Sequence, residues 1–291
     1  MQLDLFLHGA DAALRNAFIA ALHSRDAAAM GDAIDQLRAG YPQEYRLADF
    51  ERLQFEFSSL DQADHAGAAI AQQLENIETK LLPALQSVIG AGAQRWLEPV
   101  YADLAVRASR QPFTRDSAHT HAAGLFLRSG ALPEARAAIM QIPSWRRIPE
   151  PLAWMTEIAL RENAPADYWP LIAELAWIAP TLLEALFADF RAHNAQRSVL
   201  GLYQEFCCKA ELDAEEDECA WFPAWLLLEH PELLPLLRTA QPHLIPPARC
   251  AFLLIDLLLG ERMGTSPSLV DKRKELRDRA PILFRCYMAR R

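Results

Sequence analysis

The chain has 291 residues, 52% of them hydrophobic and 23% charged, so it is too apolar to be disordered and long enough to bury a large core. That length allows one elongated domain or two compact ones. Its formal charge of −9 disfavours general nucleic-acid binding, because the neutralisation of phosphates requires a basic surface.

The N-terminal segment, MQLDLFLHGA, has Asp4 early and no basic residue before Arg15, so it does not resemble a secretory signal. The most apolar later stretch, 251–259, is about half a membrane span long and contains Asp256. We therefore expect a cytoplasmic protein without a membrane segment. High Ala and Arg usage is typical of a GC-rich bacterial source.

The first 110 residues predict helices without a clear repeat. Ala, Leu, Glu, Arg and Gln dominate, and β-branched runs of strand length are scarce. Apolar side chains recur at helical spacing over 14–22, 26–39 and 47–60. A longer, more polar stretch is interrupted at Pro83, where a proline is expected to kink or end the helix. Residues 1–110 therefore predict an N-terminal helical region, either divergent hairpins or a bundle.

After residue 110, prolines punctuate short helices, and three helix ends look alike. Arg128, Arg161 and Arg191 each follow an apolar stripe, at spacings of 33 (128 to 161) and 30 (161 to 191) residues. Each precedes Gly or Asn within two or three positions. A basic residue followed by one that tolerates the left-handed conformation is typical of a helix C-terminus. The pattern predicts a helical hairpin repeated at least three times.

The first of these units resembles a known family of helical repeats. The order of its small, aromatic and aliphatic residues is that of a tetratricopeptide-like repeat: Ala123, Phe126, Gly130, Leu132, Ala135 and Ile139. The second unit departs from the pattern at Pro165 and Tyr168, and the third is looser. The chain thus resembles a degenerate tetratricopeptide-like protein over 111–210. The resemblance implies an all-α fold, a right-handed α-solenoid of stacked antiparallel hairpins, with its repeat region over 111–270.

The C-terminal tail, 271–291, is basic. Eight Lys or Arg against three acids give it a charge of +5, which leaves −14 for the rest of the chain. Apolar residues between Leu276 and Met288 predict a terminal helix that caps the solenoid. The same basicity also fits an intramolecular clasp, or a docking element for an acidic partner or RNA.

Signatures of catalysis, cofactor binding and metal binding are nearly absent. Gly90-Ala91-Gly92 lacks the third glycine of a dinucleotide loop, and no P-loop, HExxH or GxSxG motif occurs. The five cysteines fit reduced thiols better than disulfides, and Cys207, Cys208, Cys219 and His230 lack the spacing of a zinc site. We predict a protein that is not an enzyme and uses no cofactor or metal.

The candidate for a catalytic alternative lies at Asp116 and His119. These residues are three apart, so on a helix their side chains can touch. His121 is two residues further on and would face the opposite side of such a helix. A surface Asp with ordinary histidines explains the same residues.

Two sets of residues predict a partner-binding surface. If the repeated polar positions line one rim, they form a ladder of donors for a carboxylate or acidic side chains: Arg128, Arg161, Arg191, Asn163 and Asn194. Helix capping explains these residues without a ligand.

The second set is aromatic and basic. It comprises Trp145, Trp154, Trp169 and Trp177 beside Arg146 and Arg147. Trp and Arg are enriched at binding hot spots, whereas the alternative is that the tryptophans fill the space between hairpins. Because the arginine pair lies between Pro143 and Pro149, we expect it in an exposed loop that can bind an acidic or phosphorylated group.

The sequence thus predicts a non-catalytic adaptor or scaffold that binds a protein or peptide, an acidic one among the candidates, on the concave face of a solenoid. Two alternatives stay open. One is a helical hydrolase or transferase centred near Asp116 and His119, and the other is an RNA-associated factor that uses the basic tail. The oligomeric state does not follow from the sequence.

Overall fold

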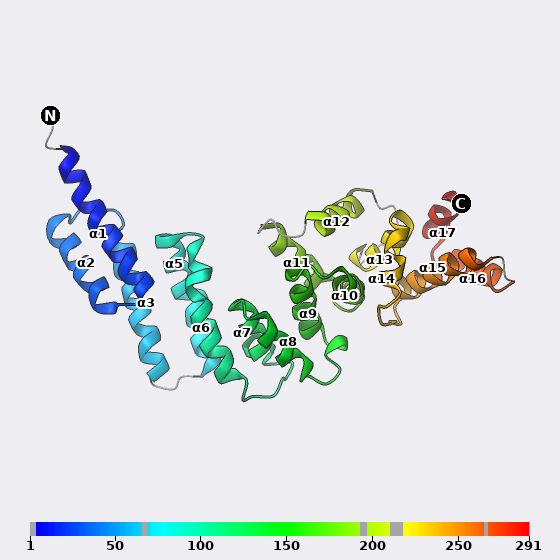
Figure 1. The fold of residues 1–291 in the computed structure, drawn as a ribbon, viewed down its shortest axis with the longest axis horizontal. Coiled ribbons are helices and arrows are strands. Elements are labelled where there is room, and N and C mark those ends of the chain that lie inside the picture. The colour runs from blue at the N-terminus through cyan, green and yellow to red at the C-terminus, as the bar shows by residue number, and fades with distance from the viewer. Residues whose placement is uncertain (1–3, 66–68, 193–196, 210–217, 265–266, 291) are drawn as a thin grey trace. The chain divides into compact units, whose positions relative to one another are not determined.

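The computed structural model describes residues 4–65, 69–192, 197–209, 218–264 and 267–290, which form helices and connecting turns without a strand (Figure 1). The predicted all-α class is confirmed. The chain divides into two compact units, Met1–Ala135 (unit 1) and Arg136–Arg291 (unit 2). The sequence-based boundaries at residues 110 and 270 stay a prediction, because compactness does not locate the ends of a repeat. In the described part of the chain, no helix combines the length and apolarity that a membrane span requires.

Unit 1 consists of helices that pack mainly on their neighbours in the chain. In order they are α1 (Asp4–Ser24), α2 (Ala27–Gly40), α3 (Leu47–His65), α4 (Ile70–Asn76), the π-helical η1 (Ile77–Leu81), α5 (Leu82–Ile89), α6 (Gly92–Ala108), the 3₁₀ turn η2 (Ala118–Thr120) and α7 (Ala122–Arg128). α8 (Leu132–Met140) begins in unit 1 and ends in unit 2. α1 packs on α2, α2 on α3, α5 on α6 and α6 on α7. The buried faces form one core, in which the Phe18 and Phe50 rings stack at 4.3 Å between centroids.

Pro83 distorts the helical run over 70–89 without ending it. The π-helical stretch η1 comes just before the proline, and there the Leu82 N–H donates to the Ile77 carbonyl. Pro83 then occupies the first turn of α5, where its missing N–H leaves no broken hydrogen bond in that helix. The expected interruption is therefore a widened turn.

Unit 2 is built around one central helix. Its elements are the 3₁₀ turn η3 (Trp145–Arg147), α9 (Pro149–Arg161), α10 (Pro165–Ile178), α11 (Pro180–Ala192), α12 (Arg197–Lys209), η4 (Glu218–Trp221), α13 (Phe222–Glu229), η5 (Pro231–Leu233), α14 (Leu234–Leu237), α15 (Pro246–Met263), α16 (Pro267–Arg279) and α17 (Pro281–Ala289). Most pack on chain neighbours, but α10 contacts α9, α11, α13 and α14. Every residue from Tyr168 to Trp177 is accordingly buried. Packing in neighbouring pairs is compatible with a helical repeat.

Two of the predicted helix ends share the same geometry. α7 ends at Arg128 and α9 at Arg161, and each is followed by a residue with positive φ, Gly130 at 76° and Asn163 at 53°. In both, the next amide reaches back five residues, from Ala131 to the Phe126 carbonyl and from Ala164 to that of Ala159. This is the Schellman closure of a helix. The helix-end interpretation is therefore confirmed for these two units, whereas Asn194 of the third lies outside the described residues.

The basic tail packs within unit 2 through α16 and α17. Leu276 and Tyr287 are buried. Its cations pair with acids of α13 and α15: Lys272 with Asp256, Arg273 with Glu261, and Arg290 with Glu229. Much of the tail's positive charge is therefore compensated inside the unit.

Candidate functional site

The arginine pair of unit 2 lies on a short turn between α8 and α9. Ser144 precedes this turn with φ 55°, and Ile148 follows it in an extended conformation. Pro149 then begins α9, and its fixed φ favours the first turn of a helix. The two arginines of this turn differ in burial, because Arg146 is half-buried and Arg147 is exposed.

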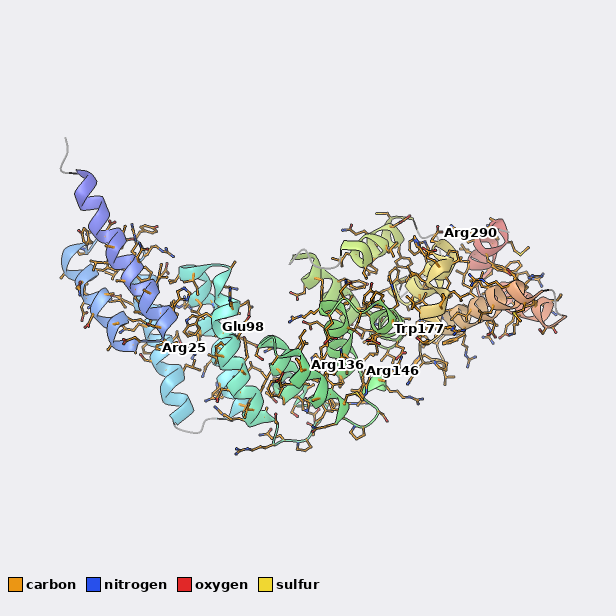
Figure 2. The ribbon with its side chains drawn as sticks, viewed as in Figure 1. Arg25, Glu98, Arg136, Arg146, Trp177 and Arg290 are labelled. Atoms are coloured by element: carbon orange, nitrogen blue, oxygen red, sulfur yellow. The ribbon has the colours of Figure 1, made fainter. Side chains whose placement is uncertain are left out.

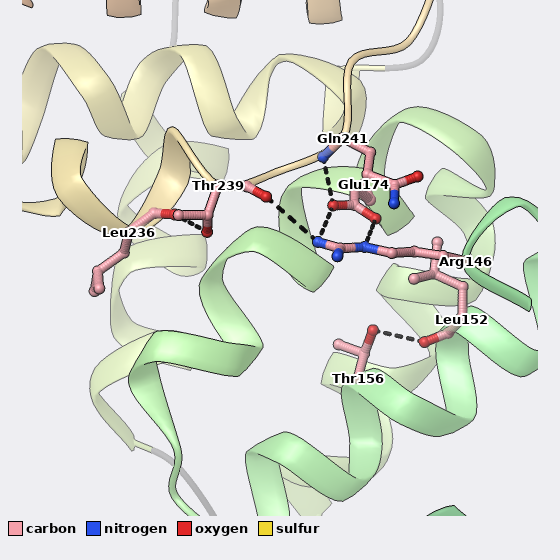
Figure 3. A network of polar contacts seen from close by, with 7 residues as sticks. All are labelled: Arg146, Leu152, Thr156, Glu174, Leu236, Thr239 and Gln241. Carbon is pink, nitrogen blue, oxygen red and sulfur yellow. Dashed lines mark hydrogen bonds and ion pairs between the residues drawn. The ribbon is translucent and has the colours of Figure 1, made fainter. Parts of the chain in front are cut away.

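Arg146 forms a bidentate ion pair with Glu174 of α10. Its Nε and Nη2 donate to the two carboxylate oxygens at 2.6 and 2.5 Å (Figure 3). Nη2 also lies 3.5 Å from the Thr239 carbonyl. Such fork-to-fork pairs add geometric specificity to their energy. Arg146 thus ties the η3 turn both to the central helix and to the segment that follows α14.

Glu174 is the buried member of this pair, with an exposed fraction of 1%. Besides the two bonds from Arg146, its Oε1 accepts the Gln241 backbone N–H at 2.6 Å (Figure 3). Burial raises the pKa of Glu174, because desolvation disfavours the charged form, while the bonds from Arg146 and Gln241 oppose the shift. The carboxylate is held by these contacts and serves to fix the turn and the loop.

A cavity of about 420 Å³ opens beside this network. Besides Arg146, Glu174 and Gln241, its walls are Arg147, Trp177, Ile178, Pro242, His243 and Leu244. A second hollow of about 490 Å³ shares the arginines and is also lined by Ser144 and Trp145. Both hollows lie entirely within unit 2, and Figure 2 labels Arg146 and Trp177 from the wall of the first. Their sizes are in the range of binding clefts for small groups.

The walls of the hollow beside Trp177 contain polar groups that the described residues leave unpartnered. Trp177 is 4% exposed, and its Nε1 has no hydrogen-bond partner there. The same holds for the buried Nδ1 of His243. Arg147 is exposed and forms no ion pair with any described residue, whereas Arg146 is compensated. Among the described residues, the walls of this hollow thus include a cation without an ion pair, Arg147, and a tryptophan whose buried N–H has no acceptor.

Of the predicted ladder residues, Arg128 and Arg161 lie at helix ends, and each forms an ion pair. Arg128 pairs with Glu78 at 2.5 Å, and its guanidinium carbon lies 5.7 Å from the Tyr101 ring centroid. Arg161 pairs with Glu157 within α9. Asn163 closes that helix with its backbone.

The hypothesis that the ladder residues line one rim stays a prediction. Arg191 lies near the end of α11, but its side chain and Asn194 are outside the described residues. Arg128 belongs to unit 1 and Arg161 to unit 2.

The predicted aromatic set divides into surface and core members. Trp169 is 4% exposed and packs with Tyr168 at 5.3 Å between ring centroids, which is the core role that the sequence also allowed. Trp154 in α9 is half-buried. Trp145 is half-buried in η3 and lines the hollow beside the arginine pair. Of this set, Trp145 and Trp177 border the candidate site.

The residues of the catalytic alternative belong to unit 1, whereas the candidate site belongs to unit 2. Asp116 and His119 are exposed, and no hydrogen bond or ion pair joins them among the described residues. His121 caps α7, since its Nδ1 accepts the Ala123 N–H at 3.2 Å. Burial lowers the pKa of His121, and its ring meets the Phe113 ring edge-on at 5.3 Å. Across the described ranges, no three His, Cys, Asp or Glu side chains gather as metal ligands.

Sequence reasoning missed Glu174, Gln241 and His243. Glu174 carries a weak signal, because it is one charge in the apolar run LIAELAWI over 171–178. Gln241 and His243 lie in a loop with nothing in the sequence to mark them.

Comparisons of the chain with protein-family models, with curated proteins and with solved structures find no match.

Proposed function

We propose that this protein is a non-catalytic adaptor or scaffold, and that unit 2 binds a segment of a partner protein at the pocket beside Arg147 and Trp177. The observation that carries the proposal is that, as far as the described residues go, the walls of one hollow combine a cation without an ion pair and a buried N–H donor without an acceptor. Arg and Trp are the side chains most enriched at binding hot spots, and such sites use few polar groups among apolar walls.

The charged residues of this pocket support binding better than catalysis. Glu174 accepts three hydrogen bonds, so its lone pairs are largely occupied by Arg146 and Gln241. A general base or nucleophile has to reach the reacting atom, and this carboxylate is instead held in place. Its contacts stabilise the shape of the pocket and leave Arg147 to meet a ligand.

The finer proposal for the fold is a right-handed, tetratricopeptide-like stack of hairpins. Support comes from the first repeat, in which Ala123, Ala135 and Ile139 are fully buried. Small residues at such positions allow two helices to approach closely, as the resemblance implies. A solenoid of this kind presents an extended surface to a partner.

A random peptide library displayed on phage and panned on the full-length protein tests the function. Synthetic copies of the selected peptides are titrated by calorimetry against the wild type and three variants. We expect Arg147→Glu to weaken binding by about tenfold or more, as removal of a hot-spot arginine does. Arg285→Glu is the matched control, because Arg285 is an exposed arginine on α17, away from the pocket residues in the sequence.

His119→Ala separates this proposal from the catalytic alternative. His119 lies in unit 1, so its replacement is expected to leave peptide binding unchanged. Failure to enrich any peptide, or binding that is equally strong in Arg147→Glu, contradicts the proposed site. Loss of binding in His119→Ala directs attention to the Asp116 region instead.

A further inference from the structure

The polar groups of the pocket also specify the chemistry of the group that enters it, an inference that rests on the proposed function. We infer that the pocket takes a carboxylate, carried next to an apolar group on the bound segment. Three independent properties of the walls lead to this assignment: their net charge, the unpartnered hydrogen-bond donor, and the exposed apolar side chains. Each is a property of unit 2 alone.

Within the described ranges, the charges that line the pocket leave one positive charge without an ion pair. Arg146 and Glu174 neutralise each other through their bidentate pair. Arg147 has no ion pair among the described residues. A carboxylate brings one negative charge, whereas a phosphate ester brings about 1.5 to 2 at pH 7. The surplus of one cation therefore matches a carboxylate, and an arginine fork fits its two oxygens.

The buried donor of Trp177 requires an acceptor. An indole N–H can only donate, and a buried donor without a partner costs free energy. Within the described part of the chain this N–H has no acceptor, although Trp177 is part of the pocket wall. A ligand oxygen that reaches Nε1 removes that cost, while an ammonium group or another pure donor cannot. The donor thus favours a ligand with an acceptor oxygen, and the charge of Arg147 is what selects an anionic one.

The apolar part of the wall lies next to these polar groups. Ile178, Pro242 and Leu244 line the same hollow, and Leu244 is 79% exposed. Exposed large apolar side chains are stabilised when a ligand covers them. The ligand that fits this wall carries its carboxylate beside an aliphatic group, as an apolar residue at a chain end or a residue next to Asp or Glu does.

The indole resonances of the intact protein, labelled with ¹⁵N at tryptophan, test the assignment. The chain has seven tryptophans, and the Trp177 signal is the one missing from Trp177→Phe, which keeps an aromatic ring and lacks the N–H. Four probes are titrated: N-acetyl-leucine, N-acetyl-leucinamide, N-acetyl-glutamic α-amide and inorganic phosphate. The other six indole signals report whether each variant is folded.

We expect N-acetyl-leucine to move the Trp177 proton resonance downfield and to saturate, and N-acetyl-leucinamide to leave it in place. In Arg147→Gln the affinity for the acid is expected to fall by about tenfold or more, as for other hydrogen bonds to charged groups. A response to N-acetyl-glutamic α-amide assigns the ligand to an acidic side chain. A response to N-acetyl-leucine alone assigns it to a chain terminus, and both outcomes support a carboxylate site.

Three results overturn the assignment: equal responses to N-acetyl-leucine and its amide, a stronger response to phosphate than to either carboxylate, or an unchanged affinity in Arg147→Gln. Two further results separate the carboxylate assignment from the proposed adaptor function. Selected peptides that still bind after C-terminal amidation and Glu→Gln or Asp→Asn replacement refute the carboxylate assignment and leave the adaptor proposal intact. Binding of the small acid without any selected peptide refutes the adaptor and leaves the carboxylate site.

Discussion

Glu174 lies inside an apolar helix, where an isolated carboxylate would be neutralised by protonation. Its side chain is 1% exposed, and burial raises its pKa. Arg146 and the Gln241 N–H offset part of that cost with direct hydrogen bonds. Buried ion pairs of this kind add little net stability but make the removal of one partner expensive. At the residue scale, Arg146 is therefore a structural support of the pocket, and Arg147, which forms no ion pair with a described residue, is the arginine that we propose to bind the ligand.

The pH dependence of stability tests this division of roles. The pKa of Glu174 is raised in the folded state, so the folded protein keeps this proton at pH values just above 4.5, where the unfolded chain has lost it. The free energy of unfolding therefore falls as pH rises from 4.5 through the raised pKa. In Arg146→Met the pKa of Glu174 rises further, so we expect a small loss of stability at pH 4 and a loss of about 3 kcal/mol at pH 7.

Urea unfolding followed by circular dichroism at pH 4, 5.5 and 7 measures this effect. The double variant Arg146→Met/Glu174→Gln is the control, since it has no carboxyl group to titrate at this position. Its stability relative to wild type is expected to lack the steep decline of the single variant. An Arg146→Met deficit that is the same at all three pH values would show that the pair contributes no charge compensation.

Two glycines with opposite surroundings illustrate packing at the scale of the elements. Gly260 in α15 faces α16 so closely that a Cβ atom would lie 2.5 Å from Cδ2 of Leu269. Leu269 is itself 4% exposed, so it has little room to move. A Cβ atom on Gly201 in α12 would meet nothing within 4 Å. Both glycines lie in helices, so both lower the free energy of unfolding relative to alanine through their poor helix propensity. They differ in how closely other atoms pack against them.

Alanine substitutions at these two positions are expected to change stability in opposite directions. Gly201→Ala raises the free energy of unfolding by about 1 kcal/mol, because alanine is the better helix former. Gly260→Ala gains the same propensity but overpacks the α15–α16 contact, which costs about 1–3 kcal/mol, for a net loss of about 1 kcal/mol. Chemical denaturation of both variants under one buffer condition measures the difference. Equal stabilisation of the two would show that α15 and α16 do not approach this closely.

At the scale of the whole molecule, charge decides which partners are compatible. The chain carries −9, and the basic tail provides +5 against −14 elsewhere. In unit 2, three cations of the tail, Lys272, Arg273 and Arg290, pair with acids of α13 and α15. A phosphate backbone would have to compete with these carboxylates for the same cations. We therefore expect nucleic acids to bind this protein weakly.

We expect no measurable binding of a fluorescein-labelled 20-nucleotide polyuridine at 150 mM salt, with a dissociation constant weaker than about 100 µM, the weak end of non-specific binding. Fluorescence anisotropy measures it. The variant Glu229→Gln/Asp256→Asn/Glu261→Gln releases the paired cations and is expected to bind more tightly at low salt. Tight binding by the wild type with a steep salt dependence would instead favour the RNA-associated alternative.

The all-α class and the helix ends at Arg128 and Arg161 were predictable because they depend on residues close in the chain. Their Schellman bonds join amides and carbonyls only five residues apart, and Gly130 and Asn163 tolerate positive φ. Pro143 and Pro149 likewise predicted that Arg146 and Arg147 lie in a loop. Local geometry requires particular residue types at fixed spacing, and that spacing is visible in the sequence.

The pocket depends on contacts that no local pattern contains. Glu174 meets Arg146 across 28 residues and Gln241 across 67. Whether Trp177 is a core residue or a pocket wall likewise depends on how α10 packs in unit 2. A buried charge is stable only where its partners and its burial arise together, and both come from elements brought together by folding. For that reason the arginine pair was visible in the sequence and its site was not.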